Sequence, residues 1–282
     1  MVNFILSAFS DEYSPEIDRQ IKWLTDNNIP MMEIRGVDGT PVADITLEKA
    51  REVKKKLDNA GISISAVGSP IGKINIKDDF APHLDQFKHL IDIAHILDAK
   101  RMRIFSFFMP EGENPSDYRD EVISRLDVLC EIAEKEGIIL CHENEKNIYG
   151  DTPERCFDLY NALGGRLKLV FDHANYISCD VEAYPYAYNT VCDGLEYMHI
   201  KDADSNKEMV PAGEGIGNIP ATISKLKETR TGDFILTLEP HLMEFSGLSG
   251  LESEGHTSIL GNKYKNTDEA FSVALSSLKK YL

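Results

Sequence analysis

Short apolar runs alternate with longer amphipathic stretches along the whole chain, and this alternation constrains the fold more than any other feature. Eight apolar runs of strand length occur at residues 4–9, 31–35, 62–67, 101–106, 138–143, 167–172, 195–200 and 234–239. Helices are expected at residues 11–29, 47–60, 80–97, 116–136, 152–165, 219–229 and 267–282, and less clearly over the Tyr-rich residues 181–192. Strands that alternate with helices pair in parallel through right-handed crossovers.

Eight strand–helix units within 282 residues match the count of a closed barrel. The predicted fold class is therefore α/β, a (β/α)8 TIM barrel formed as a single domain by residues 1–282. The alternative is an open, doubly wound parallel sheet, but no G-x-G-x-x-G follows the first run and no G-x-x-x-x-G-K-[ST] occurs. Hydrophobic residues make up 42% and charged residues 27%, which is ordinary for a globular domain with a large core.

The charge balance limits the classes of partner. Lys and Arg number 30 against 47 Asp and Glu, so the net charge of −17 argues against nucleic acid and against an anionic membrane surface. Five scattered cysteines without a C-x-x-C pair indicate reduced thiols rather than disulfides or a cysteine zinc site. No apolar stretch reaches the roughly 18 residues of a membrane span, and we expect a cytoplasmic protein.

Four successive predicted strands end in a residue that can ligate a metal: Glu143, Asp172, His199 and Glu239. The carboxyl ends of barrel strands meet at one face, where three carboxylates repel one another unless a cation lies between them. An oxygen-rich set with one imidazole suits one divalent ion, with Mn²⁺ or Mg²⁺ favoured and Co²⁺ or Zn²⁺ as alternatives. The competing interpretation is that each acid only caps the helix after its strand.

With these features the chain resembles the sugar phosphate isomerase/epimerase family of xylose isomerase-like TIM barrels. The family includes ketose 3-epimerases, inosose dehydratases and hydroxypyruvate isomerases, and it is related in fold to the endonuclease IV nucleases. The segments that carry the resemblance are His142-Glu143-Asn144, Asp172-x-x-Asn175, His199-Ile-Lys-Asp202, the turn from Pro211 to Pro220, and Leu238-Glu-Pro-His241.

The resemblance implies a metal-dependent isomerase or epimerase that acts on a small carbohydrate. Glu143, Asp172, His199 and Glu239 would bind the ion, and Glu143 and Glu239 would also carry protons through a cis-enediolate. An inosose-type dehydratase shares the ligand set and is the first alternative. A sugar-binding barrel without catalytic activity is the second, and solvent deuterium exchange into the substrate would distinguish it from an enzyme.

Four further residues are expected to bind the substrate. Asn175 stands where many epimerases have a histidine, and Lys201 where some have an arginine, although Lys201 would also fit a surface position. His241 follows Glu239 by two residues and would reach the same pocket. Glu33, in the second apolar run, is expected to hydrogen-bond a sugar hydroxyl or to cap a loop.

The remaining features concern what the chain lacks and how it assembles. The places where the nucleases carry extra ligands hold Ser69, Ser106, Lys207 and Met209, so a multinuclear nuclease cluster is not expected. By strand alternation, His142 and His173 should point away from the neighbouring ligands. The long segment 242–266 is expected to form a lid or an oligomer contact, and the alternative is a disordered insertion with neither role. A homo-oligomer is therefore among the expected states.

Overall fold

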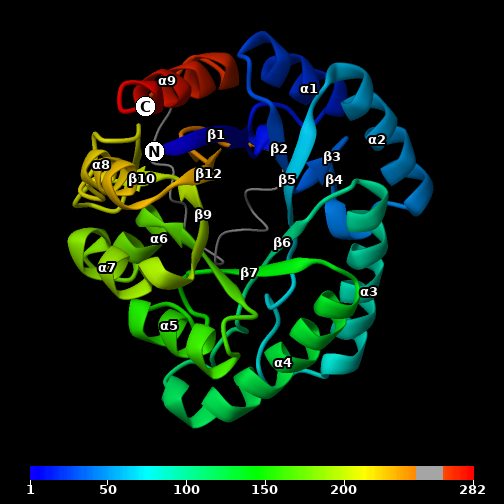
Figure 1. The fold of residues 1–282 in the computed structure, drawn as a ribbon, viewed down its shortest axis with the longest axis vertical. Coiled ribbons are helices and arrows are strands. Elements are labelled where there is room, and N and C mark those ends of the chain that lie inside the picture. Colours follow the sequence, from blue (N-terminus) through cyan, green and yellow to red (C-terminus); the bar gives the residue numbers. More distant parts are fainter. Residues whose placement is uncertain (246–262) are drawn as a thin grey trace.

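The computed structural model of the chain describes residues 1–245 and 263–282, and it forms a single-domain barrel (Figure 1). Eight parallel strands line the centre and helices surround them (Figure 1). The barrel strands are β1 (Val2–Ala8), β2 (Met31–Ile34), β5 (Ser63–Gly68), β6 (Arg101–Ile104), β7 (Ile139–Glu143), β8 (Lys168–Asp172), β9 (Leu195–Ile200) and β12 (Gly232–Leu238). The predicted TIM barrel is confirmed, and the open doubly wound sheet is wrong.

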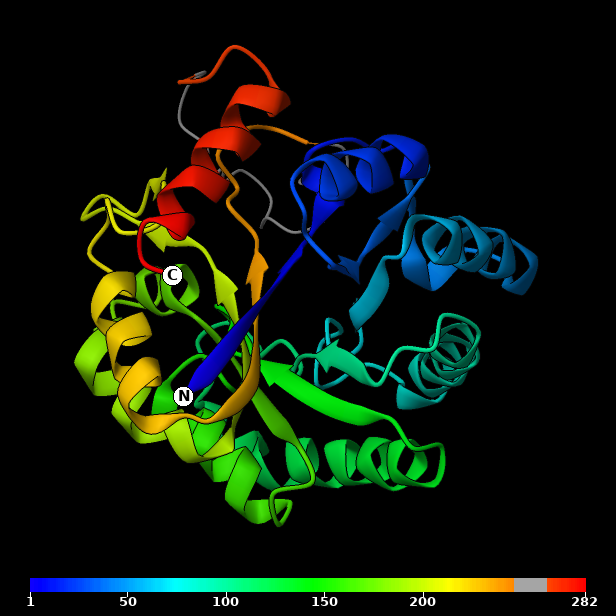
Figure 2. The same ribbon diagram turned by 45° about the horizontal axis from the view of Figure 1, so that its top comes forward.

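The order of hydrogen-bonded strands is β1-β12-β9-β8-β7-β6-β5-β2, so the barrel is closed except between β1 and β2. Strand β1 runs beside β12 over its full length, from the pair Val2–Gly232 to the pair Ala8–Leu238 (Figure 2). In the β8–β9 ladder Asp172 lies opposite His199. This register places two of the predicted metal ligands side by side at the carboxyl end of the barrel.

The helices begin and end largely where the sequence predicts. Thr46 caps its helix by accepting a hydrogen bond from the Lys49 amide, and Gly61 ends the same helix with φ +70°. The helices are α1 (Ile17–Asp26), α2 (Leu47–Ala60), α3 (Phe80–Ile96), α4 (Arg119–Lys135), α5 (Pro153–Ala162), α6 (His173–Ser178), α7 (Tyr188–Val191), α8 (Ile219–Thr229) and α9 (Thr267–Lys279). No helix of the described residues is long and apolar enough to cross a membrane.

Two local predictions need correction. The first helix begins at Ile17 and not at residue 11, because Ser10–Glu12 forms a separate 3-10 turn and Asp38 Oδ1 accepts the Ile17 amide hydrogen at 2.9 Å. The Tyr-rich stretch is not one regular helix, because Tyr184 has an extended backbone (φ −139°, ψ 132°) and α7 covers only Tyr188–Val191. Two short antiparallel pairs were not predicted: β3 (Gly36–Val37) with β4 (Thr40–Pro41), and β10 (Asp202–Ala203) with β11 (Met209–Val210).

A small apolar cluster fills the barrel interior beneath the carboxyl ends of the strands. Alternate residues of a strand point to one face, so Cys141 shares a face with Glu143, and Tyr197 shares a face with His199. The members of this cluster are Ala66, Cys141, Val170, Tyr197 and Ile235. Apolar side chains thus line the underside of the polar centre, and the low local dielectric strengthens the electrostatic interactions above them.

Most of the segment 242–266 lies outside the described residues, so its role as a lid or an oligomer contact stays a prediction.

A glycine after β5 permits a close backbone approach. Gly72 has φ +89°, and a Cβ there would lie 2.1 Å from the Phe105 carbonyl oxygen. Its carbonyl accepts the Phe107 amide hydrogen at 2.9 Å, and its amide donates to His83 Nε2 at 2.7 Å. The turn is therefore fixed between β6 and α3, and it carries neighbouring residues to the mouth of the barrel.

We expect Gly72→Ala to destabilise the fold strongly. The control Gly112→Ala also requires a positive φ, +75°, but its Cβ would meet nothing within 4 Å. The control should cost about 1 kcal/mol for the left-handed backbone, and Gly72→Ala roughly 2–3 kcal/mol more for the overlap. Urea unfolding followed by circular dichroism measures both. Equal losses in the two variants would contradict the close approach.

Candidate metal centre and active site

The four predicted metal ligands meet at the carboxyl end of the barrel. Glu143 ends β7, Asp172 ends β8, His199 lies near the end of β9, and Glu239 follows β12. One ligand atom from each lies within 4.8 Å of the others, and all four side chains are buried. The strands therefore bring together the residues that the sequence placed at four successive strand ends.

The two glutamates converge on the same nitrogen of His199. Glu143 Oε1 and Glu239 Oε2 each lie 3.0 Å from His199 Nδ1. On the other side of the ring, Glu33 Oε2 lies 3.2 Å from Nε2. The imidazole is thus held with Nδ1 facing the ligand cluster and Nε2 facing an acceptor, the arrangement that orients a metal-binding histidine.

Glu33 lies deeper in the barrel than the sequence-based interpretations assumed. Its side chain is fully buried, with Oε1 accepting from the Tyr197 hydroxyl at 2.7 Å and Oε2 beside His199. Glu33 lines neither cavity at the mouth of the barrel, and it caps no loop. The residue lies one layer below the candidate ligands and contacts the His199 ring, and its contact with a substrate hydroxyl stays a prediction.

Asp172 serves two purposes with its two oxygens. Oδ1 accepts the Asn175 amide hydrogen at 2.8 Å and so caps α6, whereas Oδ2 lies 3.0 Å from Lys201 Nζ on the cluster side. The Asn144 side chain fixes this strand end by donating to the Asp172 carbonyl and accepting from its amide, both at 3.0 Å. Capping and metal ligation are therefore compatible for this residue.

Two arginines that the sequence analysis did not assign hold the two glutamates. Arg103 Nη1 donates to Glu143 Oε2 at 3.1 Å, and Arg35 Nη1 donates to Glu239 Oε1 at 3.0 Å. Arg35 also forms a bidentate pair with Asp11. Arg103 lies in β6 and Arg35 directly follows β2, and strand alternation turns both side chains toward the barrel interior. This position of a charged residue in an apolar run was the sequence feature that could have revealed them.

The cations determine which acids are ionised. Burial favours neutral Glu143, but His199 and Arg103 outweigh it and lower the pKa of that carboxyl to about 2. Burial likewise opposes ionised Glu239, yet Lys201 and His199 lower its pKa well below the usual range. Burial raises the pKa of Asp172 to about 7, and Lys201 offsets this only in part. At neutral pH the two glutamates are therefore carboxylates that can accept a proton.

The donor set fits a single divalent ion. Asp172 Oδ2 and Glu239 Oε2 are buried and accept no hydrogen bond of good geometry from the described residues, although Lys201 Nζ and His199 Nδ1 each lie 3.0 Å away. Burial opposes a proton on His199, yet Glu143, Glu33 and Glu239 raise its pKa well above the ordinary value, so the cluster attracts positive charge. Three carboxylates and one oriented imidazole supply the ligands that Mn²⁺, Mg²⁺ or Zn²⁺ accepts.

A second group of potential ligands is less suitable. Glu12, Glu239 and His241 also offer atoms within 4.8 Å of one another. Arg35, however, already donates to both glutamates of this group, so its guanidinium occupies the place of a cation. Burial disfavours a charge on His241, but Glu12 and Glu239 raise its pKa to about 9. This group therefore balances its own charge.

The other predicted substrate-binding residues lie around the same pocket. Asn175, Lys201 and His241 line a cavity of about 50 Å³ that also contains Glu143 and Glu239. Lys201 is only 5% exposed, so the alternative of a surface lysine is wrong. Asn175 donates to Glu143 Oε1 at 3.1 Å, and His241 Nε2 lies 3.4 Å from Glu239 Oε1.

The two histidines next to ligands point away, as predicted from strand alternation. His142 Nε2 hydrogen-bonds Ser106 Oγ at 2.9 Å, and His173 Nε2 hydrogen-bonds Thr222 Oγ1 at 3.0 Å. Burial lowers the pKa of His142 to about 4 and of His173 to about 3, so both are neutral. They are structural residues beside the site.

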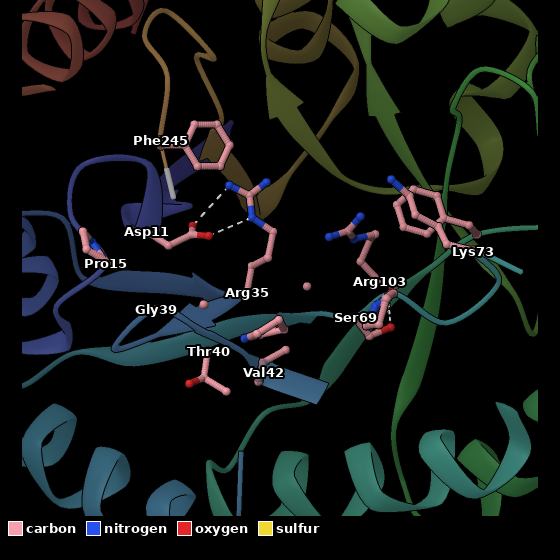
Figure 3. A pocket seen from close by; sticks show the side chains of 15 residues that line it. Asp11, Pro15, Arg35, Gly39, Thr40, Val42, Ser69, Lys73, Arg103 and Phe245 are labelled. Carbon is pink, nitrogen blue, oxygen red and sulfur yellow. Dashed lines mark hydrogen bonds and ion pairs between the residues drawn. The ribbon is translucent and has the colours of Figure 1, made fainter. Parts of the chain in front are cut away.

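A second cavity, of about 200 Å³, lies between the ends of β2, β5 and β6. It shares Arg35, Lys73 and Arg103 with the cavity of about 50 Å³ beside Glu143 and Glu239, which we call the metal pocket, so the two spaces adjoin. Figure 3 shows its lining, with Asp11 paired to Arg35 and with Phe245 beside the Arg35 guanidinium. The candidate metal centre therefore adjoins a larger space.

Comparison with known proteins identifies the family. The sequence profile of the xylose isomerase-like TIM barrel family matches residues 21–256. The chain belongs to this family. Comparison with curated protein sequences finds no match.

Solved structures share this xylose isomerase-like fold across the whole chain. A D-allulose 3-epimerase from Methylomonas sp. has a TM-score of 0.76 at 15% identity, covering 99% of this chain and 98% of its own. The IOLI protein with a bound zinc atom has 0.75 at 16%, covering 99% of each chain. The probable 3-DHS dehydratase AsbF from Bacillus anthracis has 0.71 at 15%, also covering 99% of each. At such identities the likeness shows the fold alone.

We expect the purified protein to bind about one divalent ion per chain through the four ligands. Asp172→Ala and His199→Ala should each reduce the bound metal to a small fraction, because each removes a buried donor. Asp180→Ala, at an exposed surface position, is the matched control and should leave occupancy unchanged. Elemental analysis after dialysis against Mn²⁺ or Zn²⁺ measures all three. Full occupancy in both ligand variants would overturn the assignment.

Proposed function

We propose that this chain is a divalent-metal-dependent isomerase or epimerase that moves a proton on the carbon next to the carbonyl of a small carbohydrate. The observation that carries the proposal is the arrangement of Glu143 and Glu239. They come from different strands, turn one oxygen each toward His199 Nδ1, and are each held by an arginine of their own. Two positioned carboxylates at one centre are what a proton removal and return require.

The chemistry divides between the ion and the chain. A divalent ion bound by the four ligands would polarise the substrate carbonyl and acidify the neighbouring C–H group. Glu143 would take the C–H proton onto one carboxylate oxygen, and Glu239, after taking up a proton from solvent, would give that proton to the enediolate from its own side. The proton taken from the substrate would stay on Glu143 until it exchanges with solvent. Arg103 and Arg35 hold these carboxylates in place, because each donates to the oxygen that faces away from His199. Reversal exchanges the roles of the two glutamates.

The surrounding residues suit a polyhydroxy substrate. Asn175, Lys201 and His241 line the metal pocket, and their side chains supply both donors and acceptors for hydroxyl groups. Lys201 Nζ lies 3.0 Å from Asp172 Oδ2 and 3.7 Å from Glu239 Oε2, so it would face a substrate oxygen at the ion. An inosose-type dehydratase begins with the same proton removal and then loses a hydroxyl, so product analysis separates it from an epimerase.

We expect Glu143→Gln and Glu239→Gln to lose turnover by on the order of 10²–10⁴-fold, because an amide ligates weakly but takes up no proton. Net epimerisation should fail in both variants, while proton exchange survives in the one whose remaining glutamate faces the C–H group. Proton NMR in D₂O with a panel of ketoses measures exchange and product together. Glu111→Gln, at an exposed position, is the control and should match the unaltered protein.

Two outcomes would contradict the proposal. Near-normal turnover of either metal-loaded glutamate variant would show that the proton carriers lie elsewhere, with His241 the next candidate. Binding of sugars by the metal-loaded protein without any deuterium exchange across the panel would favour the sugar-binding barrel that lacks catalytic activity.

A further inference from the structure

The cavity of about 200 Å³ beside the metal pocket has an unusual charge for this chain. The whole protein carries a net charge of −17, yet the charged residues that line this cavity are three cations, Arg35, Lys73 and Arg103, and one carboxylate, Asp11. The rest of the lining is apolar side chains, small residues and backbone. Positive charge has therefore been concentrated here against the overall trend.

Arg35 and Asp11 neutralise each other. Arg35 Nε lies 2.9 Å from Asp11 Oδ2 and Nη2 lies 3.2 Å from Asp11 Oδ1, a bidentate pair, and its remaining contacts go to Glu12 and Glu239. The guanidinium is sandwiched near the rings of Phe9 and Phe245, at 4.4 and 5.0 Å from their centroids. Arg35 is thus fully engaged, and the surplus charge belongs to Arg103 and Lys73.

Arg103 is buried with most of its hydrogen-bonding capacity unused. It is 4% exposed, and among the described residues it donates one hydrogen bond to a carboxylate, from Nη1 to Glu143. Nε is buried with no partner in the described structure. A Cβ on Gly68 would lie 3.2 Å from Nη2, so the absence of a side chain at that position leaves this edge of the guanidinium open. A buried donor without an acceptor is costly, which points to an acceptor that the chain does not supply.

Lys73 lies on the same side of the cavity with weak counter-charge. Its Nζ is 4.3 Å from the centroid of Phe105 and 3.5 Å from Glu145 Oε2, while Arg103 Cζ lies 4.4 Å from the same ring. Burial lowers the pKa of Lys73, and Glu145 offsets this only in part. In Figure 3 the head group of Arg103 lies between Arg35 and Lys73. In the described part of the chain, each of these two cations has a single carboxylate partner, Glu143 for Arg103 and Glu145 for Lys73, so an anion placed here would add a second one to both.

We propose that the substrate carries a compact anionic group, a carboxylate or a phosphate, which binds in this cavity between Arg103 and Lys73. This inference rests on the proposed function, because the same molecule must reach the metal pocket. Arg103 connects the two spaces: Nη1 holds Glu143, while Nε and Nη2 remain for the anion. The substrate class is thereby narrowed from neutral sugars to acidic or phosphorylated polyhydroxy carbonyl compounds.

Three four-carbon probes without a carbonyl test the proposal, because they bind but do not react. They are erythritol, D-erythronate and D-erythritol 4-phosphate, titrated calorimetrically into the metal-loaded protein. At least one anionic probe should bind roughly 10- to 100-fold more tightly than erythritol, as a charge-assisted hydrogen bond implies. Whichever anion binds more tightly identifies the group as a carboxylate or a phosphate.

Variants locate the anion. Arg103→Gln and Lys73→Gln should each reduce the preference for the anion to within a few-fold of the neutral probe, and Arg103→Lys should restore part of it. Lys77→Gln removes a positive charge at an exposed position outside the cavity and should leave the preference unchanged. If Arg103→Gln loses metal or folds poorly, the result for Lys73→Gln decides the test, because the ion pair of Lys73 is with Glu145 and not with a candidate metal ligand.

Equal affinity for neutral and anionic probes would overturn the inference, as would an anion preference that persists in both glutamine variants. These failures differ from failure of the proposed function. A protein that binds one ion and exchanges substrate protons with D₂O, but shows no preference for anions, keeps the proposed function and loses only the anionic subsite. A protein that binds no ion and exchanges no protons loses the proposed function itself.

Discussion

Buried negative charge at the carboxyl end of the barrel is the constraint on which the site depends. Glu33, Glu143, Asp172 and Glu239 are each at most 4% exposed, and acids so close together and removed from water require positive charge nearby. The chain supplies part of it through side chains from other strands: Arg35, Arg103, Lys201 and His199. A divalent ion at the centre of the four ligands would supply the rest.

The barrel makes this concentration of charge possible. Its parallel ladders hold the strands in fixed register, so that Asp172 stands opposite His199 and the inward positions of β7, β8 and β9 reach one point. The apolar cluster below excludes water from the underside of the site. Removal of any one charge would leave its partners uncompensated in a dry environment, so the residues act as a unit and their effects on stability and on turnover will not be additive.

Most of the fold and the convergence of the four candidate ligands could be predicted from the sequence because both depend on local patterns. Strand-length apolar runs indicate the strands, and in a barrel the last residues of the strands meet at one face. The positions of Glu143 and Asp172 at strand ends therefore predict that they lie in the functional site. The depth of Glu33 was not foreseen, for the converse reason. Its position along the chain does not reveal its depth, which depends on the partners Tyr197 and His199 from across the barrel.

The arginines show the same limit more clearly. Arg35 and Arg103 are visible in the sequence as charges at apolar strand runs, but their function depends on contacts across 204 and 40 residues of chain, with Glu239 and Glu143. The short pair β3–β4 and the helix α6 were not anticipated, since each is too short to show a periodic pattern. Long-range contacts therefore set the electrostatics of the site, and those were the part that sequence patterns could not supply.

The central claim is that one ion occupies the space between the four ligands. Anomalous diffraction from crystals soaked in zinc, recorded at the zinc absorption edge, tests it most directly. The account predicts a single strong peak about 2.0–2.2 Å from one atom each of Glu143, Asp172, His199 and Glu239. A peak held instead by Glu12, Glu239 and His241, or no peak at the barrel centre at saturating zinc, would contradict it.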